Sequence, residues 1–157
     1  MRSPGQRLLR LWRRLHRLPG GTRLFSLIFG WRVPYSRSVR PHIRVLFPGH
    51  AEVEIPDRRA NRQHLGSVHA VALVNLAEVA SGTAMLTALP PGTRGIVTGL
   101  SIEYLKKARG TLAAESTVTL PDVTESREIE VHARIRDAEG AEVARATVTW
   151  LVGPNRS

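Results

Sequence analysis

The chain has 157 residues and no cysteine, which excludes disulfide bonds and thiolate metal sites and fits a reducing, cytoplasmic compartment. Its formal net charge is +10, but the charge is uneven: residues 1–30 carry seven arginines and no acidic residue, whereas the rest of the chain is nearly balanced. The basic character is therefore mainly an N-terminal feature. The length suits one domain with a substantial core.

Residues 5–18 have the pattern of an amphipathic helix, in which apolar side chains recur on one side and arginines on the other. Pro19-Gly20-Gly21 ends this pattern, and a short apolar segment follows at 24–29. We expect residues 1–33 to form a basic helical lead-in to a domain over residues 34–153. Two interpretations stay open: a helix packed on the outside of the domain, which we favour, or a peripheral contact with a membrane surface.

The N-terminal arginines do not by themselves indicate a targeting or nucleic-acid-binding segment. The apolar run is too short for a signal peptide, no small-residue cleavage site follows it, and serine is too scarce for a transit peptide. No helix-turn-helix, zinc-finger or ribonucleoprotein motif accompanies the arginines, so we do not expect nucleic acid as a partner.

Two strands are predicted before the centre of the chain. Residues 43–47 and 51–55 are rich in strand-forming side chains, the second segment alternates between apolar and polar residues, and Pro48-Gly49 joins them in a turn. Residues 57–62 form a charged loop that leads into the next element. The alternation predicts that the strand over residues 51–55 has one polar face.

Residues 68 to about 85 predict the central helix of the domain. Ser67 is a suitable N-cap, and Gly66 suits a tight turn before it. The segment is apolar nearly all round, so we expect it to be buried on most sides. It is too short and too polar for a membrane span, because His69, Asn75 and Glu78 interrupt it.

The rest of the chain is predicted to be β-structure. Strands are expected over residues 96–107, 111–120, 128–136 and 142–152, with turns at 90–92 and 137–140. Two strands, one buried helix and four strands together fit an α+β fold in which a long antiparallel sheet wraps around a single apolar helix.

Glu78 is the anomaly of the central helix, because burying a carboxylate is costly unless it is paired. One interpretation is that it caps a neighbouring group or faces a solvent channel. The other is that it is a catalytic carboxylate in a cleft, whose proton affinity is tuned by burial. At the helix start, the N–H groups around His69 and Ala70 lack partners within the helix and suit a developing oxyanion.

Glu78 lies nine residues after His69, which is two and a half turns and ~13 Å of rise, so the two groups point to opposite sides of the helix. One helix does not bring both groups to one reacting atom. Two antiparallel copies of the helix do, if each site takes the helix start from one chain and the carboxylate from the other.

Three stretches resemble the hotdog-fold acyl-CoA thioesterases: residues 64–70 (HLGSVHA), 75–78 (NLAE) and 99–110 (GLSIEYLKKARG). The resemblance covers roughly residues 34–152. It is closest to the phenylacetyl-CoA type and to a related hotdog group known only as a domain of unknown function. Two positions depart from the phenylacetyl-CoA type, which has His-Gly-Gly at residues 69–71 and often an Asn at the position of Gln63.

The resemblance implies a hotdog fold, hydrolysis of an acyl-CoA thioester and an active site at a dimer interface. In such enzymes an acidic residue at the Glu78 position serves as nucleophile or general base, and the helix-start amide, here that of Ala70, polarises the thioester carbonyl. As partners we expect acyl-CoA and a second copy of the chain, in a dimer or a tetramer.

We therefore assign a candidate site. The catalytic set is Glu78, the backbone N–H of Ala70, His64 and Gln63, and the substrate-binding set is His69, Gly66, Asn75, Ser81, Lys106, Lys107 and Arg109. Asn75 and Ser81 each lie three residues from Glu78 and are expected to hydrogen-bond its carboxylate. The Lys/Arg cluster at a strand end is either solvated or holds the phosphates of coenzyme A.

We expect no metal, since the six histidines lack ligand spacing, and no cofactor apart from coenzyme A as part of the substrate. Two other functions stay open. One is a non-catalytic acyl-CoA or lipid-binding module at the membrane surface. The other is a structural protein whose dimer interface buries Glu78.

Overall fold

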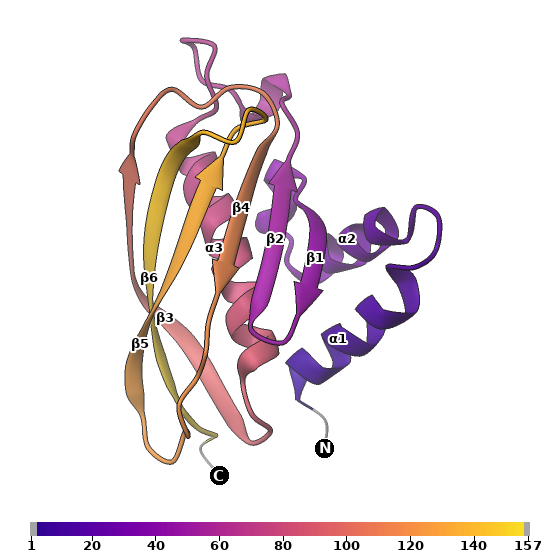
Figure 1. The fold of residues 1–157 in the computed structure, drawn as a ribbon, viewed down its shortest axis with the longest axis vertical. Helices are drawn as coiled ribbons and strands as arrows, with labels where there is room; N and C mark the ends of the chain where they lie inside the picture. The colour runs from indigo at the N-terminus through magenta and orange to yellow at the C-terminus, as the bar shows by residue number, and fades with distance from the viewer. Residues whose placement is uncertain (1–2, 156–157) are drawn as a thin grey trace.

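The computed structural model describes residues 3–155 as one antiparallel sheet wrapped around a helix (Figure 1). Within these residues the strands are β1 (His42–Phe47), β2 (His50–Ile55), β3 (Thr93–Tyr104), β4 (Leu112–Thr117), β5 (Arg127–Arg136) and β6 (Glu142–Pro154). They pair in the order β1-β2-β4-β5-β6-β3, so β1 and β3 are the edge strands. The predicted α+β architecture is confirmed.

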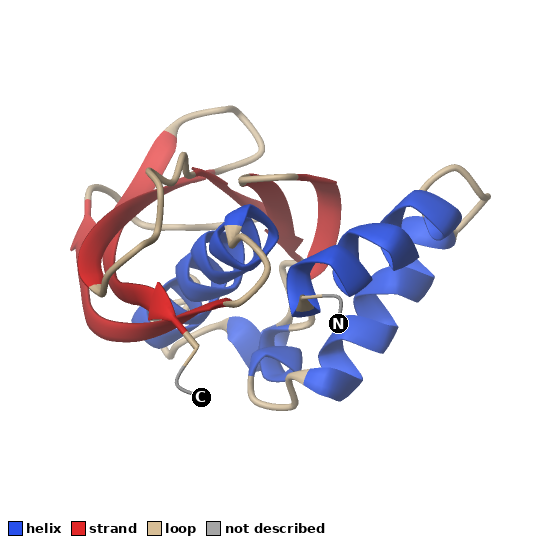
Figure 2. Ribbon diagram, turned by 90° about the horizontal axis from the view of Figure 1, so that it is seen from below, coloured by secondary structure: helices blue, strands red, loops and turns tan. Residues whose placement is uncertain are grey.

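Helix α3 (Ala70–Ala88) lies in the hollow of the curved sheet, as Figure 2 shows from below. It packs mainly on β2, β4 and β5, and Leu76 and Met85 are fully buried. The helix has 19 residues and a mean hydropathy of 1.4 in its apolar window, so the expectation that it is too short and too polar for a span is wrong on those criteria. Its place identifies it as a core helix, because 67% of that window is buried within the fold.

Two N-terminal helices, α1 (Pro4–Leu15) and α2 (Gly21–Arg32), pack beside β1. A capping box of Ser3 and Gln6 starts α1. Trp12 of α1 is buried and meets Phe25 of α2 edge to face, with ring centroids 5.0 Å apart. The interpretation of the first helix as packed on the domain is therefore confirmed, and the short apolar segment that follows it is a second helix.

Strand boundaries agree with the predictions to within two residues except at three ends. The strand expected from residue 96 begins at Thr93. The strand expected to reach residue 107 ends at Tyr104, because the N–H groups of Leu105 and Lys106 turn to the carbonyl of Val143. The strand expected over residues 111–120 ends at Thr117. Two short 3-10 helices are η1 (Ser36–Val39), which lies before β1, and η2 (Arg59–Asn61), which lies within the predicted charged loop.

Candidate functional site

Glu78 faces a small hollow of about 190 Å³ between α2, η1, α3, β3 and β6. Most of its wall is apolar: it includes Phe29, Val33, Met85, Leu86, Leu89 and Trp150. Gly95 of the edge strand β3 also lines it, so the hollow borders the β3 edge of the sheet. The predicted carboxylate on the buried helix therefore lies beside an apolar recess.

The carboxylate of Glu78 is half-buried and unpaired. Among residues 3–155 no cation lies within ion-pairing distance of it and no side chain donates a hydrogen bond to it. Burial in this apolar recess raises the pKa of Glu78, because the charged form loses hydration without gaining a partner. A carboxylate in this state binds a proton more readily than an exposed one.

The hydrogen bonds expected from Asn75 and Ser81 to this carboxylate do not form. The Ser81 hydroxyl donates to the backbone carbonyl of Glu78 at 3.2 Å, and the Asn75 amide donates to the Ser38 hydroxyl at 3.4 Å. The amide oxygen of Asn75 is buried without a partner among the described residues. Ser81 is therefore held by the backbone of its own helix and Asn75 by η1, and neither orients the Glu78 carboxylate.

Two residues of the hollow were missed by the sequence analysis. The indole nitrogen of Trp150 is buried without a hydrogen-bond partner in the described part of the chain. A Cβ atom placed on Gly82 would lie 3.5 Å from Glu78 Oε1 and 3.5 Å from Trp150 Cζ2. The carboxylate and the indole therefore border the same small space, which the missing side chain of Gly82 leaves open.

The helix start differs from the prediction in its cap. His69, not Ser67, is the N-cap of α3, and its Nδ1 accepts the backbone N–H of Val71 at 3.1 Å. The N–H of His69 donates to the carbonyl of Asn61 at 2.8 Å, so it is not free for a ligand. The N–H of Ala70, the first residue of the helix, has no acceptor among residues 3–155 and Ala70 is exposed.

Ser67 is used by the preceding loop instead. The Gln63 amide donates to its hydroxyl at 2.7 Å, and the Gln63 side-chain oxygen accepts the N–H of Leu65 at 2.8 Å. Gly66 has a φ of +76°, which closes this turn. Gln63 is thereby fixed in the loop, whereas the His64 side chain is exposed next to it.

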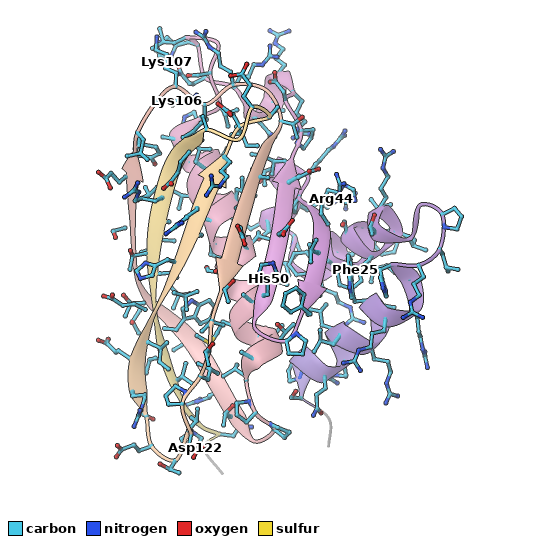
Figure 3. All side chains as sticks on the ribbon, in the orientation of Figure 1. Phe25, Arg44, His50, Lys106, Lys107 and Asp122 are labelled. Carbon is cyan, nitrogen blue, oxygen red and sulfur yellow. The ribbon has the colours of Figure 1, made fainter. Side chains whose placement is uncertain are left out.

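The basic cluster at the end of β3 lies beside this helix start, because the N–H of Val68 donates to the carbonyl of Ala108 at 2.8 Å. Figure 3 places Lys106 and Lys107 at the same end of the molecule. Lys106 is paired with Asp137, with Nζ 2.7 Å from Oδ2. Lys107 and Arg109 are exposed and have no ion pair among the described residues, so these two remain available for an anion.

Strand β3 connects the two candidate groups. Near one end, Gly95 lines the Glu78 hollow, and at the other end the hydroxyl of Tyr104 donates to the carbonyl of Ala70 at 3.2 Å. Glu78 and Ala70 are eight residues apart on one helix, which is ~12 Å of rise, so one chain does not bring them to a common reacting atom.

A second cluster of polar groups lies on the outer face of the sheet, where strand pairing sets Glu52 opposite Glu115. These carboxylates and the His50 ring offer ligand atoms within 4.8 Å of one another. His50 Nε2 lies 3.5 Å from Glu52, and its Nδ1 is 2.8 Å from the Thr117 hydroxyl. One ring nitrogen of His50 therefore has a hydrogen-bond partner, while the carboxylates of Glu52 and Glu115 face each other across the strand pair.

Comparison with known proteins confirms the fold. A crystal structure described only as genomics APC5556 superposes with a TM-score of 0.82 at 32% identity, covering 94% of this chain and 99% of that one. A Pseudomonas aeruginosa protein of unknown function, described as a probable thioesterase, gives 0.75 at 22% identity, with 88% and 97% covered. A Haemophilus influenzae thioesterase gives 0.67 at 19%, with 76% and 82% covered. The predicted hotdog fold is confirmed.

No curated protein matches the sequence. Residues 21–152 match the model of a family described as a domain of unknown function, DUF4442. This span includes α2, the whole sheet down to most of β6, and the central helix. The predicted relation to a hotdog group known only as a domain of unknown function is confirmed, and the chain belongs to the DUF4442 family.

Proposed function

We propose that this protein hydrolyses the thioester bond of acyl-CoA at sites formed between two copies of the chain. The observation that carries the proposal is the unpaired, half-buried carboxylate of Glu78 in an apolar recess. A carboxylate with a raised pKa is a stronger base than an ordinary one, which suits the removal of a proton from water. The apolar wall suits an acyl chain.

In the proposed reaction, Glu78 takes a proton from a water molecule as the water oxygen attacks the thioester carbonyl carbon. The tetrahedral intermediate collapses, the carbon–sulfur bond breaks, and the thiolate of coenzyme A takes up a proton as it leaves. An alternative with the same residue is direct attack by the carboxylate, which gives an anhydride that water then cleaves. Both routes build negative charge on the carbonyl oxygen.

The N–H of Ala70 is the proposed donor to that oxygen, since it has no acceptor in the described part of its own chain and lies at the positive end of α3. It must come from a second copy. If two β3 edges pair antiparallel about a two-fold axis near Gly99, the Tyr104 end of one strand lies beside the Gly95 end of the other. The Tyr104 hydroxyl is hydrogen-bonded to the carbonyl of Ala70, and Gly95 lines the same hollow as Glu78. This pairing would therefore bring the helix start of one chain to the carboxylate of the other.

The remaining predicted residues take roles around this centre. Lys107 and Arg109, exposed beside the helix start, are proposed to hold the phosphates of coenzyme A. His64, exposed in the loop that Gln63 and Gly66 shape, is proposed to orient the thioester or the attacking water. His69 is proposed to contribute by fixing the helix start as its cap.

The structural neighbours described as thioesterases support hydrolysis as the reaction class. They share the fold at 19–22% identity, and the substrate proposed for this chain rests on its own residues.

The test uses two variants that each remove one half of the site. Glu78→Gln removes the carboxylate. Ala70→Pro removes only the N–H, because proline is tolerated at the first position of a helix and the preceding His69, with φ −63° and ψ 138°, already has the extended backbone that proline requires. Each homodimer is expected to lose about 100-fold or more of the rate of thiol release from a panel of short, long and aromatic acyl-CoAs.

Mixing the two variants under conditions that exchange subunits decides where the site lies. In a shared site, the heterodimer contains one intact site, in which the Ala70 N–H and the Glu78 carboxylate come from different chains. Activity is then expected to return to about a quarter of wild type, because half the dimers are mixed and each has one working site. No return of activity would place both groups within one chain, and no turnover by the folded wild-type dimer would refute the hydrolase.

One observation favours a second candidate, a module that binds acyl-CoA without cleaving it: Asn75 and Ser81 do not orient the Glu78 carboxylate. Binding of a non-hydrolysable acyl-CoA ether by wild type and Glu78→Gln alike, together with no thiol release by wild type, would establish that function instead.

A further inference from the structure

We infer that the outer face of α2 is a docking surface for an anionic lipid bilayer. The surface is named here the α2 ridge and consists of Leu24, Leu27, Ile28 and Trp31. Leu24, Leu27 and Trp31 are three and seven residues apart, so they lie on one side of the helix. The ridge is independent of the proposed hydrolysis.

The ridge is unusually exposed for side chains of its kind. Leu24 is 48% exposed, Leu27 58% and Trp31 71%, while Phe25 on the opposite side of the helix is fully buried. Helix α2 is therefore apolar on both sides, and within residues 3–155 only its inner side packs against the rest of the fold. A row of exposed leucines with a tryptophan is a mark of a helix that lies in a membrane interface.

Arginines border the ridge on both sides. One hollow of about 640 Å³ is lined by Arg23, Arg37 and Arg40, and its single carboxylate, Glu54, is already paired with Arg44 at 2.9 Å. On the other side, a hollow of about 400 Å³ between α1 and α2 is lined by Arg7 and Arg32. Each hollow places guanidinium groups next to an apolar ridge, which is the arrangement that an anionic headgroup above acyl chains requires.

The charge of the surrounding surface matches the same partner. Residues 4–32, which include both helices, contain seven arginines and no acidic residue. None of these arginines is in an ion pair among residues 3–155. A surface with this charge is attracted to anionic lipid and repels a second copy of itself, which argues against the ridge as a self-association face.

The position of the ridge leaves it free when two copies pair. The helices pack beside β1, at the opposite edge of the sheet from β3, as Figure 1 shows. The inner side of α2 contributes Phe29 to the wall of the Glu78 hollow. The helix that is inferred to lie on the bilayer therefore also borders the recess, although the inference does not depend on turnover there.

The experiment measures flotation of the full-length chain with vesicles of phosphatidylcholine alone or with about one-third phosphatidylglycerol. Wild type is expected to float with the anionic vesicles and to be released by salt. Leu24→Ser/Leu27→Ser/Trp31→Ser and Arg23→Gln/Arg32→Gln are each expected to lower the partition coefficient about tenfold or more. The control Arg127→Gln/Arg134→Gln removes the same charge from exposed positions on β5 and is expected to change binding less than threefold.

Three results would overturn the inference. One is equal flotation of wild type and the ridge variant. The second is equal loss of binding in the β5 control, which would mean that net charge alone acts. The third is a shift of the ridge variant to a smaller assembly by light scattering, which would make the ridge a protein–protein interface. Circular dichroism and melting of each variant establish that it is folded, and the exposed positions chosen make folding defects small.

Discussion

The two edges of the sheet are treated differently by the rest of the chain. At β1, helices α1 and α2 pack beside the strand, and the Ser26 hydroxyl accepts the backbone N–H of Ile43 at 2.9 Å. At β3, twelve residues run along the edge with no further strand of residues 3–155 beyond them, and Ile96 is 64% exposed. A long bare edge is open to pairing with another strand, and β3 is therefore the edge at which a second copy is proposed to join.

The Glu78 hollow lies at the bare edge, and the α2 ridge lies at the covered one. The proposed catalytic centre is incomplete in one chain, because the unpaired carboxylate and the free N–H of Ala70 are held apart by the helix that carries both. The β1 edge is covered by helices of the same chain, and the α2 ridge on the outside of those helices stays exposed. One edge is thus inferred to serve assembly and the other to serve attachment.

The largest effect is expected from a variant that blocks strand pairing at the β3 edge. Ile96→Lys places a charge on β3 where the second strand would pair, so the assembly is expected to fall to a monomer of 17.3 kDa and hydrolysis to drop about 100-fold as the partner's Ala70 is lost. Light scattering and thiol release measure the two effects. The matched control is Phe47→Lys, a half-exposed apolar residue at the end of β1, which is expected to keep both the dimer and the activity. Loss of the dimer in the control but not in Ile96→Lys would reverse the assignment of the edges.

The pKa of Glu78 gives the next effect, on stability. An acid whose pKa is raised in the folded state contributes stability that is fully present below its unfolded pKa and is lost as the pH rises through its folded pKa. At pH 7 the ionised carboxylate is therefore a cost to the fold. Glu78→Gln is expected to raise the free energy of unfolding by about 0.5–2 kcal/mol at pH 7, and the gain is expected to vanish below about pH 4.

Denaturant unfolding across this pH range measures that gain, with the exposed Glu130→Gln on β5 as the control. A stability difference that does not depend on pH would contradict the origin in a buried carboxylate. In activity the same group acts with the opposite sign: hydrolysis needs the ionised form, so the rate is expected to fall on acidification at a pH above the ordinary carboxyl range.

Much of the fold was predictable because its signals are local. Alternation along β5 and the glycine turn at Gly140, with φ +84°, fix that hairpin within the sequence itself. The apolar run of α3 has no polar face, which predicts a helix buried on most sides. The position of Glu78 on that run was visible for the same reason.

The parts that could not be predicted depend on contacts between distant segments. Ser67 is the better capping residue by type, but the Gln63 amide occupies it, and His69 caps the helix instead. Asn75 bonds Ser38 of η1, 37 residues away, rather than its helical neighbour Glu78. Trp150 reaches the hollow only through the pairing of the last strand, so no spacing in the sequence points to it.

A smaller effect is expected at Gly82, which keeps the hollow open. Alanine fits there, since its Cβ would lie at an ordinary contact distance of 3.5 Å from both Glu78 and Trp150. Gly82→Ala is expected to stabilise the helix by about 0.5–1 kcal/mol while lowering kcat/KM for bulky acyl groups more than for acetyl. Unfolding and a chain-length panel measure this. An unchanged chain-length preference in the more stable variant would place the acyl chain elsewhere.

The smallest effect is expected at the basic cluster. Lys106 is paired with Asp137, whereas Lys107 and Arg109 have no ion pair among the described residues. Lys107→Gln/Arg109→Gln is expected to raise KM for acyl-CoA about two- to tenfold with kcat unchanged, because exposed charge contacts contribute modestly to binding. Lys106→Gln is expected to change KM less than twofold, since its ammonium already lies 2.7 Å from the Asp137 carboxylate, whose pKa it lowers. The KM effect of the double variant is expected to shrink in high salt, because screening weakens the contacts that it removes. If removal of Lys106 raised KM as much as removal of the other two side chains, net charge near β3 would be what attracts the substrate. If only Lys106→Gln raised KM, the ion pair with Asp137 would have to open when coenzyme A binds.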